Sequence, residues 1–159
     1  MTIIDGHNLL WALDQTLGER EITTEIELCR ALSRYFAATG EQGQVIFDGS
    51  GPNDTMEFET IANPEVFFAG FRYDADGVIE ERIKASTSPR QLTVVSSDRR
   101  LRKAAAARKA TTIKCERFWE QVRKELARSK PRKKEPEAKR EGLTESETDK
   151  WLEVFGLDQ

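Results

Sequence analysis

Four aspartates lie at or near points where apolar stretches of the chain give way to polar residues. Asp5, Asp48 and Asp98 each follow a short apolar run typical of a buried strand, and Asp76 lies near the start of a predicted helix. Carboxylates that are brought together repel one another and resist ionisation unless a cation lies between them. Mg²⁺ and Mn²⁺ prefer oxygen ligands and activate water for attack on phosphodiester bonds. These residues therefore favour metal-dependent cleavage of a phosphodiester.

The same residue types also have purely structural roles. Asp and Asn commonly form turns and cap helices, so this alternative stays open for Asp5, Asn8, Asp48, Asp76 and Asp98. Glu80 is four residues beyond Asp76 and projects from the same side of the predicted helix, although such acids are often only solvated. His7 is the single histidine, which excludes a histidine-based metal site and favours a packing role.

A basic segment begins directly after Asp98. It contains Arg99, Arg100, Arg102 and Lys103 on one short predicted helix. Side chains of this kind bind nucleic-acid phosphates when they lie beside a site that cuts them. The alternative is an ordinary solvated helix face.

Apolar periodicity predicts strands that alternate with helices. Strands are expected at residues 3–4, 44–47, 66–68, 92–95 and 111–113. Helices are expected after Asn8, after the capping box formed by Thr24 and Glu27, at residues 56–62, after Asp74, from Arg99 and over residues 116–128. This alternation predicts a parallel sheet with right-handed crossovers. If the first and fourth strands are neighbours, Asp5 and Asp98 face each other across the crevice at the strand ends.

Composition limits the remaining possibilities. The chain has 159 residues and a net charge of −3, but residues 129–142 hold six Lys/Arg and three Glu. We therefore expect a domain over residues 1–128, a charged linker over 129–142 and a helical segment over 143–159. No apolar run reaches membrane-spanning length, and the amino terminus lacks a secretory signal pattern. Cys29 and Cys115 fit no metal spacing, so we expect buried, reduced thiols in a cytoplasmic protein.

Four segments, in this order, resemble the NYN domain, and more narrowly its YacP-like branch among the PIN-like nucleases. They are IDGHNLL at 4–10, VIFDG at 45–49, AD followed by IE at 75–80, and VVSSDR at 94–99. The resemblance implies a three-layer α/β/α sandwich with a central parallel sheet of strand order 3-2-1-4-5, here with a C-terminal helical appendage. It also implies metal-dependent endoribonuclease activity, and the leading hypothesis is an enzyme that cuts single-stranded RNA with Mg²⁺ or Mn²⁺.

The resemblance also assigns roles to residues. It implies that Asp5, Asp76 and Asp98 hold the metal, that Asn8 orients the site and that Asp48 is peripheral. Members often have a second acid after the Ala-Asp pair, where this chain has Gly77, which leaves Glu80 as a substitute.

Two other functions remain as alternatives. The first is an RNA- or ribosome-associated binding protein without cleavage activity. The second is a small-molecule phosphohydrolase or nucleotide binder, which the lack of a glycine-rich phosphate loop disfavours. The sequence carries no signal for an oligomeric state.

Overall fold

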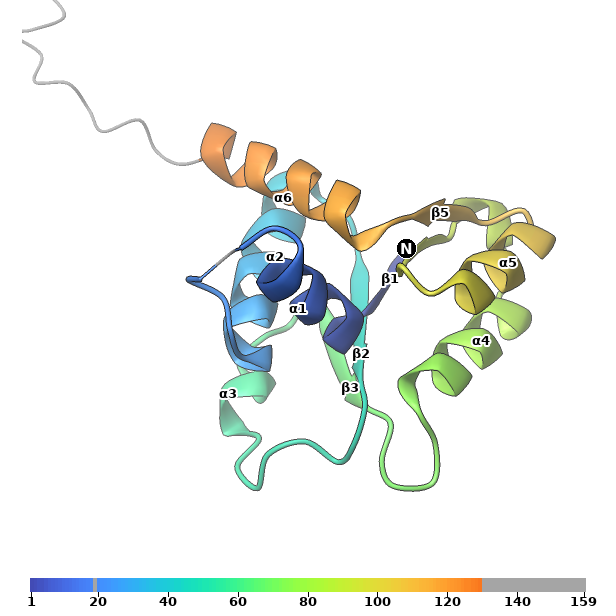
Figure 1. Ribbon diagram of the computed structural model, residues 1–159, viewed down its shortest axis with the longest axis horizontal. Helices are drawn as coiled ribbons and strands as arrows, with labels where there is room; N and C mark the ends of the chain where they lie inside the picture. The colour runs from blue at the N-terminus through green and yellow to red at the C-terminus, as the bar shows by residue number, and fades with distance from the viewer. Residues whose placement is uncertain (19, 130–159) are drawn as a thin grey trace, which may run out of the picture. The chain divides into compact units, whose positions relative to one another are not determined.

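A five-stranded, all-parallel sheet forms the centre of the molecule. The computed structural model describes residues 1–18 and 20–129, and Figure 1 shows its elements. The strands are β1 (Thr2–Asp5), β2 (Gly43–Phe47), β3 (Glu65–Phe68), β4 (Thr93–Val95) and β5 (Thr111–Ile113). The helices are α1 (Gly6–Gln15), α2 (Glu25–Thr39), α3 (Met56–Glu59), α4 (Ala75–Ala85), α5 (Arg99–Ala107) and α6 (Cys115–Ser129), with a 3₁₀ turn at Pro89–Gln91.

The strand order is β3-β2-β1-β4-β5, as the resemblance implied. In the register of the sheet, Ile4 on β1 pairs with Val45 on β2 and with Val95 on β4. All of the pairings are parallel, so the carboxyl ends of the strands meet at one edge. The residues that follow β1 and β4 are therefore neighbours at that edge.

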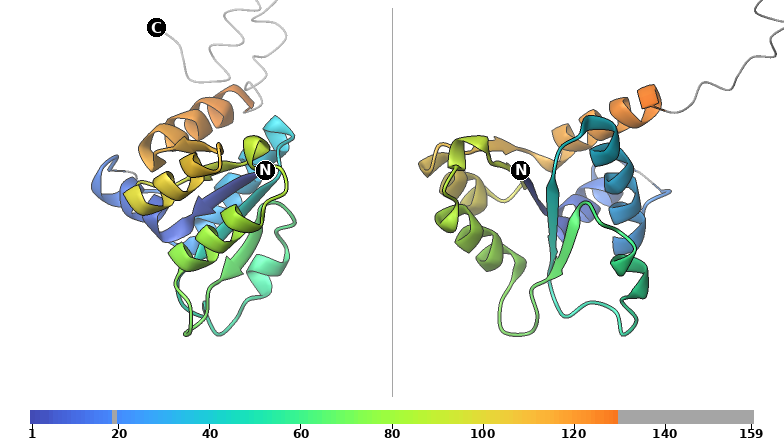
Figure 2. Two further views of the ribbon diagram at one scale, coloured as in Figure 1. Left: turned by 90° about the vertical axis from the view of Figure 1, so that its right-hand side faces the viewer. Right: turned by 180° about the vertical axis from the view of Figure 1, so that it is seen from behind.

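Helices cover both faces of the sheet, which gives the predicted three-layer sandwich (Figure 2). Side chains along a strand point alternately to the two faces. Ile4 packs in the core beneath α1, α2 and α6, and its neighbour Ile3 packs in the core beneath α4 and α5. Because both faces are buried, the strands read as continuous apolar runs rather than as alternating ones.

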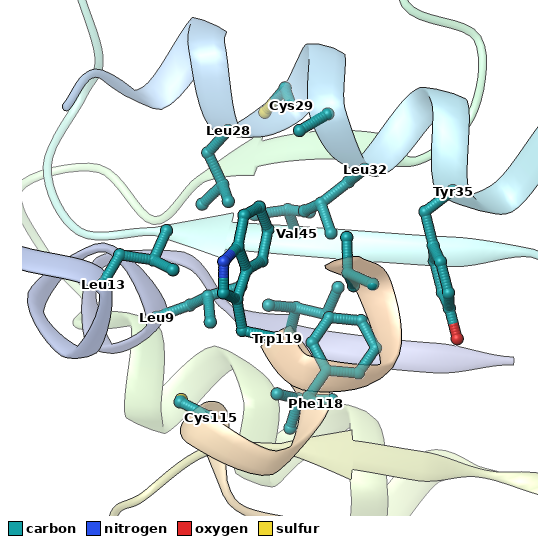
Figure 3. Close-up of a cluster of buried hydrophobic side chains, with 14 of the residues drawn as sticks. Leu9, Leu13, Leu28, Cys29, Leu32, Tyr35, Val45, Cys115, Phe118 and Trp119 are labelled. Atoms are coloured by element: carbon teal, nitrogen blue, oxygen red, sulfur yellow. The ribbon is translucent and has the colours of Figure 1, made fainter. Parts of the chain in front are cut away.

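The larger core is built around Trp119 of α6 (Figure 3). Its indole lies among leucines of α1 and α2 and against the sheet, and its side chain is 2% exposed. Phe118 and Val122 are buried with it, as predicted, and Leu126 packs at the margin of the core. This packing fixes α6 against the same face as α1, the helix that begins at Asp5.

Local signals set most of the helix boundaries. The capping box forms as predicted, because Thr24 accepts from the Glu27 backbone and Glu27 accepts from the Thr24 backbone. The Thr23 backbone also donates to Glu27, and the Thr23 and Thr24 donors together lower the pKa of Glu27. Gly40 ends α2 in the left-handed conformation, with φ of 75°.

Most boundaries lie within one residue of the sequence prediction, and two helix boundaries differ by about three. No separate turn follows β1, because Asp5 itself caps α1 and the helix begins at Gly6. Helix α3 ends at Glu59 rather than at residue 62. It has no side-chain cap, and Pro64 soon afterwards disfavours helical conformation in the residue before it.

Other sequence expectations concern the cysteines and the carboxyl-terminal region. Cys29 and Cys115 are buried and unpaired. The predicted linker over 129–142 and helical segment over 143–159 lie outside the described residues, apart from Ser129, where α6 ends. Among the described residues, no helix combines the length and apolarity needed to cross a membrane.

Candidate active site

Asp5 lies at the centre of the carboxyl edge of the sheet. It ends β1, its side chain is 5% exposed, and its Oδ1 accepts a hydrogen bond from the Asn8 backbone at 3.4 Å. Capping a helix uses one carboxylate oxygen and leaves the other free for a further contact. Asp5 therefore has the structural role that the sequence left open, and it also keeps an oxygen for chemistry.

Asp98 has the same arrangement on the neighbouring strand. It caps α5, with its Oδ1 accepting from the Arg100 backbone at 2.8 Å. Its own backbone donates to Oγ of the fully buried Ser96 at 3.0 Å. Because β1 pairs directly with β4, Asp98 is held next to Asp5 at the strand ends.

Asp76 approaches from the first turn of α4. The N-cap of that helix is Asp74, which accepts from the Gly77 backbone at 2.7 Å, so Asp76 has no capping role. Instead, the carboxyl group of Asp76 lies close enough to those of Asp5 and Asp98 for the two to raise its pKa. We call Asp5, Asp76 and Asp98 together the aspartate site.

Two acids of this site, Asp5 and Asp76, are hard to ionise. Burial, and then the charges of Asp48 and Asp98, raise the pKa of Asp5 to about 6, although the backbone hydrogen bond from Asn8 opposes the shift. Burial, and then hydrogen bonding and repulsion from Asp98 and Asp5, raise the pKa of Asp76 to about 7. Within residues 1–18 and 20–129, no lysine or arginine forms an ion pair with any of the three.

The donor chemistry therefore fits a hard divalent cation, which would neutralise the repulsion. The positions of the side chains fit an ion less well than their chemistry does. The described part of the chain has no group of three His, Cys, Asp or Glu side chains placed around one ion position. The three carboxyl groups influence one another's charge, but as placed they do not surround an ion.

Asn8 ties the two strand ends together. Its Oδ1 accepts from the Ser97 backbone at 2.7 Å and from the Cys115 thiol at 3.1 Å. Burial raises the pKa of Cys115 to about 12, so the thiol keeps the proton that it donates. Asn8 thus holds the segment just before Asp98 against the start of α1.

Asp48 and His7 form a second link, which reaches α4. Oδ1 of Asp48 accepts from the Ala75 backbone at 2.7 Å, and Nδ1 of His7 accepts from the Asp48 backbone at 3.1 Å. Because Nδ1 accepts, Nε2 carries the proton and donates to Glu25 at 3.1 Å, which lowers the pKa of Glu25. Asp48 is thus placed where it steadies the helix that carries Asp76.

Glu80 and the basic residues are arranged differently from the three aspartates. Glu80 pairs with Arg100 at 2.7 Å and lies 4.0 Å from Lys84. Arg99 and Lys103 are exposed, and Arg102 is half-buried with an Nε that has no hydrogen-bond partner among the described residues. Arg99 and Lys103 form no ion pair within the described part of the chain, whereas Arg100 pairs with Glu80.

Sequence reasoning missed the partners that position these residues. They are Glu25, Ser97 and Cys115, which lie 18, 89 and 107 residues from the side chains they contact. A short motif carries no signal for contacts at that separation. Of these three partners, only Cys115 carried a sequence signal, because it was expected to be buried.

Comparisons with known proteins agree with this architecture. The sequence matches the family described as the YacP-like NYN domain over residues 2–155. A crystal structure of Rae1 (YacP) from Bacillus subtilis is 20% identical with a TM-score of 0.67, covering 98% of this chain and 92% of that one. A structure of a mutant of the same protein is 22% identical with a TM-score of 0.62, covering 80% and 77%. No curated protein matches the chain.

Proposed function

Because the chain belongs to the YacP-like NYN domain family, whose domains are of the PIN-like nuclease type, we propose that it is a metal-dependent endoribonuclease for single-stranded RNA. The single observation that carries the proposal is the aspartate site. Three interacting carboxyl groups, two of them with raised pKa values, meet at the carboxyl edge without a basic partner among the described residues. Structural acids are normally paired or solvated, so this arrangement is unfavourable unless function requires it.

Asp5, Asp76 and Asp98 are the residues proposed to hold Mg²⁺ or Mn²⁺. When bound, such an ion lowers the pKa of water and stabilises charge that develops on the phosphate. The chain itself fixes the carboxylates: capping restrains Asp5 and Asp98, and the Asp48 link restrains the start of α4.

The RNA backbone is proposed to lie along the start of α5. Arg99 and Lys103 are exposed there, and phosphates interact favourably with exposed cations and with helix N-termini. Arg102 and Arg100 complete the predicted basic set, and Arg100 would have to exchange Glu80 for phosphate. A cytoplasmic location, where RNA is present and thiols stay reduced, belongs to the same proposal.

Cleavage of a mixed RNA pool, with Mn²⁺ or with a chelator, tests the proposal. We expect metal-dependent fragments whose ends can be mapped, and we expect Asp5→Asn and Asp98→Asn to lower cleavage to background while circular dichroism shows an intact fold. Asp14→Asn is the matched control, because Asp14 is exposed on the same helix that Asp5 caps. Unchanged turnover in both site variants would reject the assignment.

One observation favours a second function, an RNA- or ribosome-associated binding protein that does not cleave. No three candidate ligands among the described residues already surround an ion position. RNA binding without metal-dependent fragments, across several substrates, would select this function instead.

A further inference from the structure

Two aromatic side chains near the aspartate site have no place in the core. Phe71 is 93% exposed and Tyr73 is 68% exposed, and both lie in the loop between β3 and α4. Arg72 stands between them and is also exposed. Most other large aromatic side chains of the described chain pack against the core, with Trp11 as an exception, so two exposed rings in one short loop are unusual here.

The loop that carries them is anchored at both ends. On one side, the Ala69 backbone donates to Phe47 and the Gly70 backbone donates to Gly49, both at 2.8 Å. On the other side, the Ala75 backbone donates to Asp48 at 2.7 Å. Residues 71–74 therefore project from fixed points at the carboxyl end of β2, and Figure 1 shows the loop extending beyond the end of β3.

The position of the loop relates it to the aspartate site. Tyr73 is three residues before Asp76, and the Asp48 link holds the start of α4 at the same edge of the sheet as Asp5. An RNA strand whose phosphate lay at the aspartate site would therefore pass its neighbouring nucleotides close to this loop.

We propose that Phe71 and Tyr73 form a stacking platform for the unpaired bases of single-stranded RNA beside the cleavage site, with Arg72 contacting the backbone. This inference rests on the proposed function and adds a substrate feature to it. Stacking on an aromatic ring requires an unpaired base, so the platform selects single strands without reading their sequence. The arginine between the rings favours a polyanion over an apolar protein surface as the occupant.

Binding of a fluorescent oligoadenylate 12-mer to the full-length protein, measured by anisotropy in chelator, separates binding from cleavage. We expect Phe71→Ala and Tyr73→Ala each to weaken binding about tenfold, since one base stack contributes on that scale. A 12-mer of abasic ribose phosphate should bind wild type and both variants equally. Phe71→Tyr should retain the wild-type affinity, because the ring remains.

Salt titration separates stacking from charge. Phe71→Ala should leave the slope of log affinity against log salt unchanged, whereas Arg72→Gln should reduce it by about 0.7 for one lost phosphate contact. Trp11→Ala is the matched control. Trp11 is 62% exposed, but it lies on α1, over the opposite face of the sheet from α4.

Each outcome decides the proposal. Equal affinities of Phe71→Ala, Tyr73→Ala and wild type for oligoadenylate overturn the platform, even if metal-dependent cleavage persists. Losses of equal size on the abasic strand, or a change in sedimentation that shows the loop joins two copies of the chain, also overturn it. Tenfold losses confined to oligoadenylate support the platform, even if no cleavage is found and the nuclease assignment fails.

Discussion

Replacing Asp5 by Asn should make the protein more stable in chelator while it abolishes the response to metal. Asn is as good an N-cap as Asp, so the hydrogen bond from the Asn8 backbone to residue 5 is retained. What is lost is a buried negative charge that faces Asp76 and Asp98. The substitution therefore isolates the electrostatic role of the residue from its structural role.

The size of the effect follows from the pKa. Burial chiefly, with repulsion from Asp48 and Asp98, raises the pKa of Asp5 from 3.8 to about 6. At pH 8 this ionised group destabilises the fold by about 3 kcal/mol relative to the unfolded chain, at ~1.4 kcal/mol for each unit. The amide needs hydrogen bonds of its own, so we expect a net gain of about 2 kcal/mol for Asp5→Asn.

The raised pKa of Asp5 fixes the sign of the pH dependence of stability. A carboxyl group with a folded-state pKa above its unfolded value contributes stability that is fully present below pH 3.8. That contribution is lost as the pH rises through about 6. The advantage of Asp5→Asn should therefore be largest at pH 8 and shrink towards pH 4.5.

Urea unfolding at pH 8 and pH 4.5, with chelator or with Mn²⁺, measures the gain in stability, its pH dependence and the response to metal. Wild type should gain stability from Mn²⁺ at pH 8 by mass action on the folded state, and Asp5→Asn should not. Asp14→Asn should behave as wild type in all four conditions. An Asp5→Asn variant that is less stable than wild type at pH 8 in chelator would refute the electrostatic account of this site.

Three further predictions concern the scaffold, and urea unfolding measures each. Gly6→Ala should destabilise by about 1–3 kcal/mol, because an added Cβ would lie 2.2 Å from the ring of Phe47; a neutral result would mean that the ring can move aside. Trp119→Ala should destabilise by about 3–5 kcal/mol through the cavity it leaves, and a loss under 1 kcal/mol would contradict its central place in the core. Thr24→Ala should destabilise by about 1 kcal/mol through loss of the cap on Glu27, with Thr24→Ser close to wild type.

Local patterns predicted the scaffold well. The capping box at Thr24, the cap at Asp74 and the inward face of α6 all follow from spacings within one helix, where the sequence and the contact are near each other. The sheet order came from the resemblance rather than from periodicity. Alternating strands and helices allow several parallel orders, and only the neighbouring position of β1 and β4 places Asp98 next to Asp5.

The hydrogen-bond and ion-pair partners of the side chains could not be predicted from local patterns. Arg100 was expected to bind phosphate, but α4 and α5 pack side by side and bring Glu80 within 2.7 Å of it. The acceptor for the Ser97 backbone is Asn8, 89 residues away. Such contacts depend on which helices share a face of the sheet, which is a property of the whole topology.

Capping and function are not competing explanations for these aspartates. In a parallel sheet, each strand that leads directly into a helix brings that helix's N-terminus to the carboxyl edge, so the acids of a site at that edge also lie next to unsatisfied backbone N–H groups. Asp5 and Asp98 use those groups, whose partial positive charge offsets some of the repulsion among the carboxylates. Asp76 is the exception, because Asp74 takes the cap of α4, and it has the higher of the two raised pKa values. The helix N-termini thus fix the carboxyl groups of Asp5 and Asp98 through their caps, whereas Asp76 caps no helix.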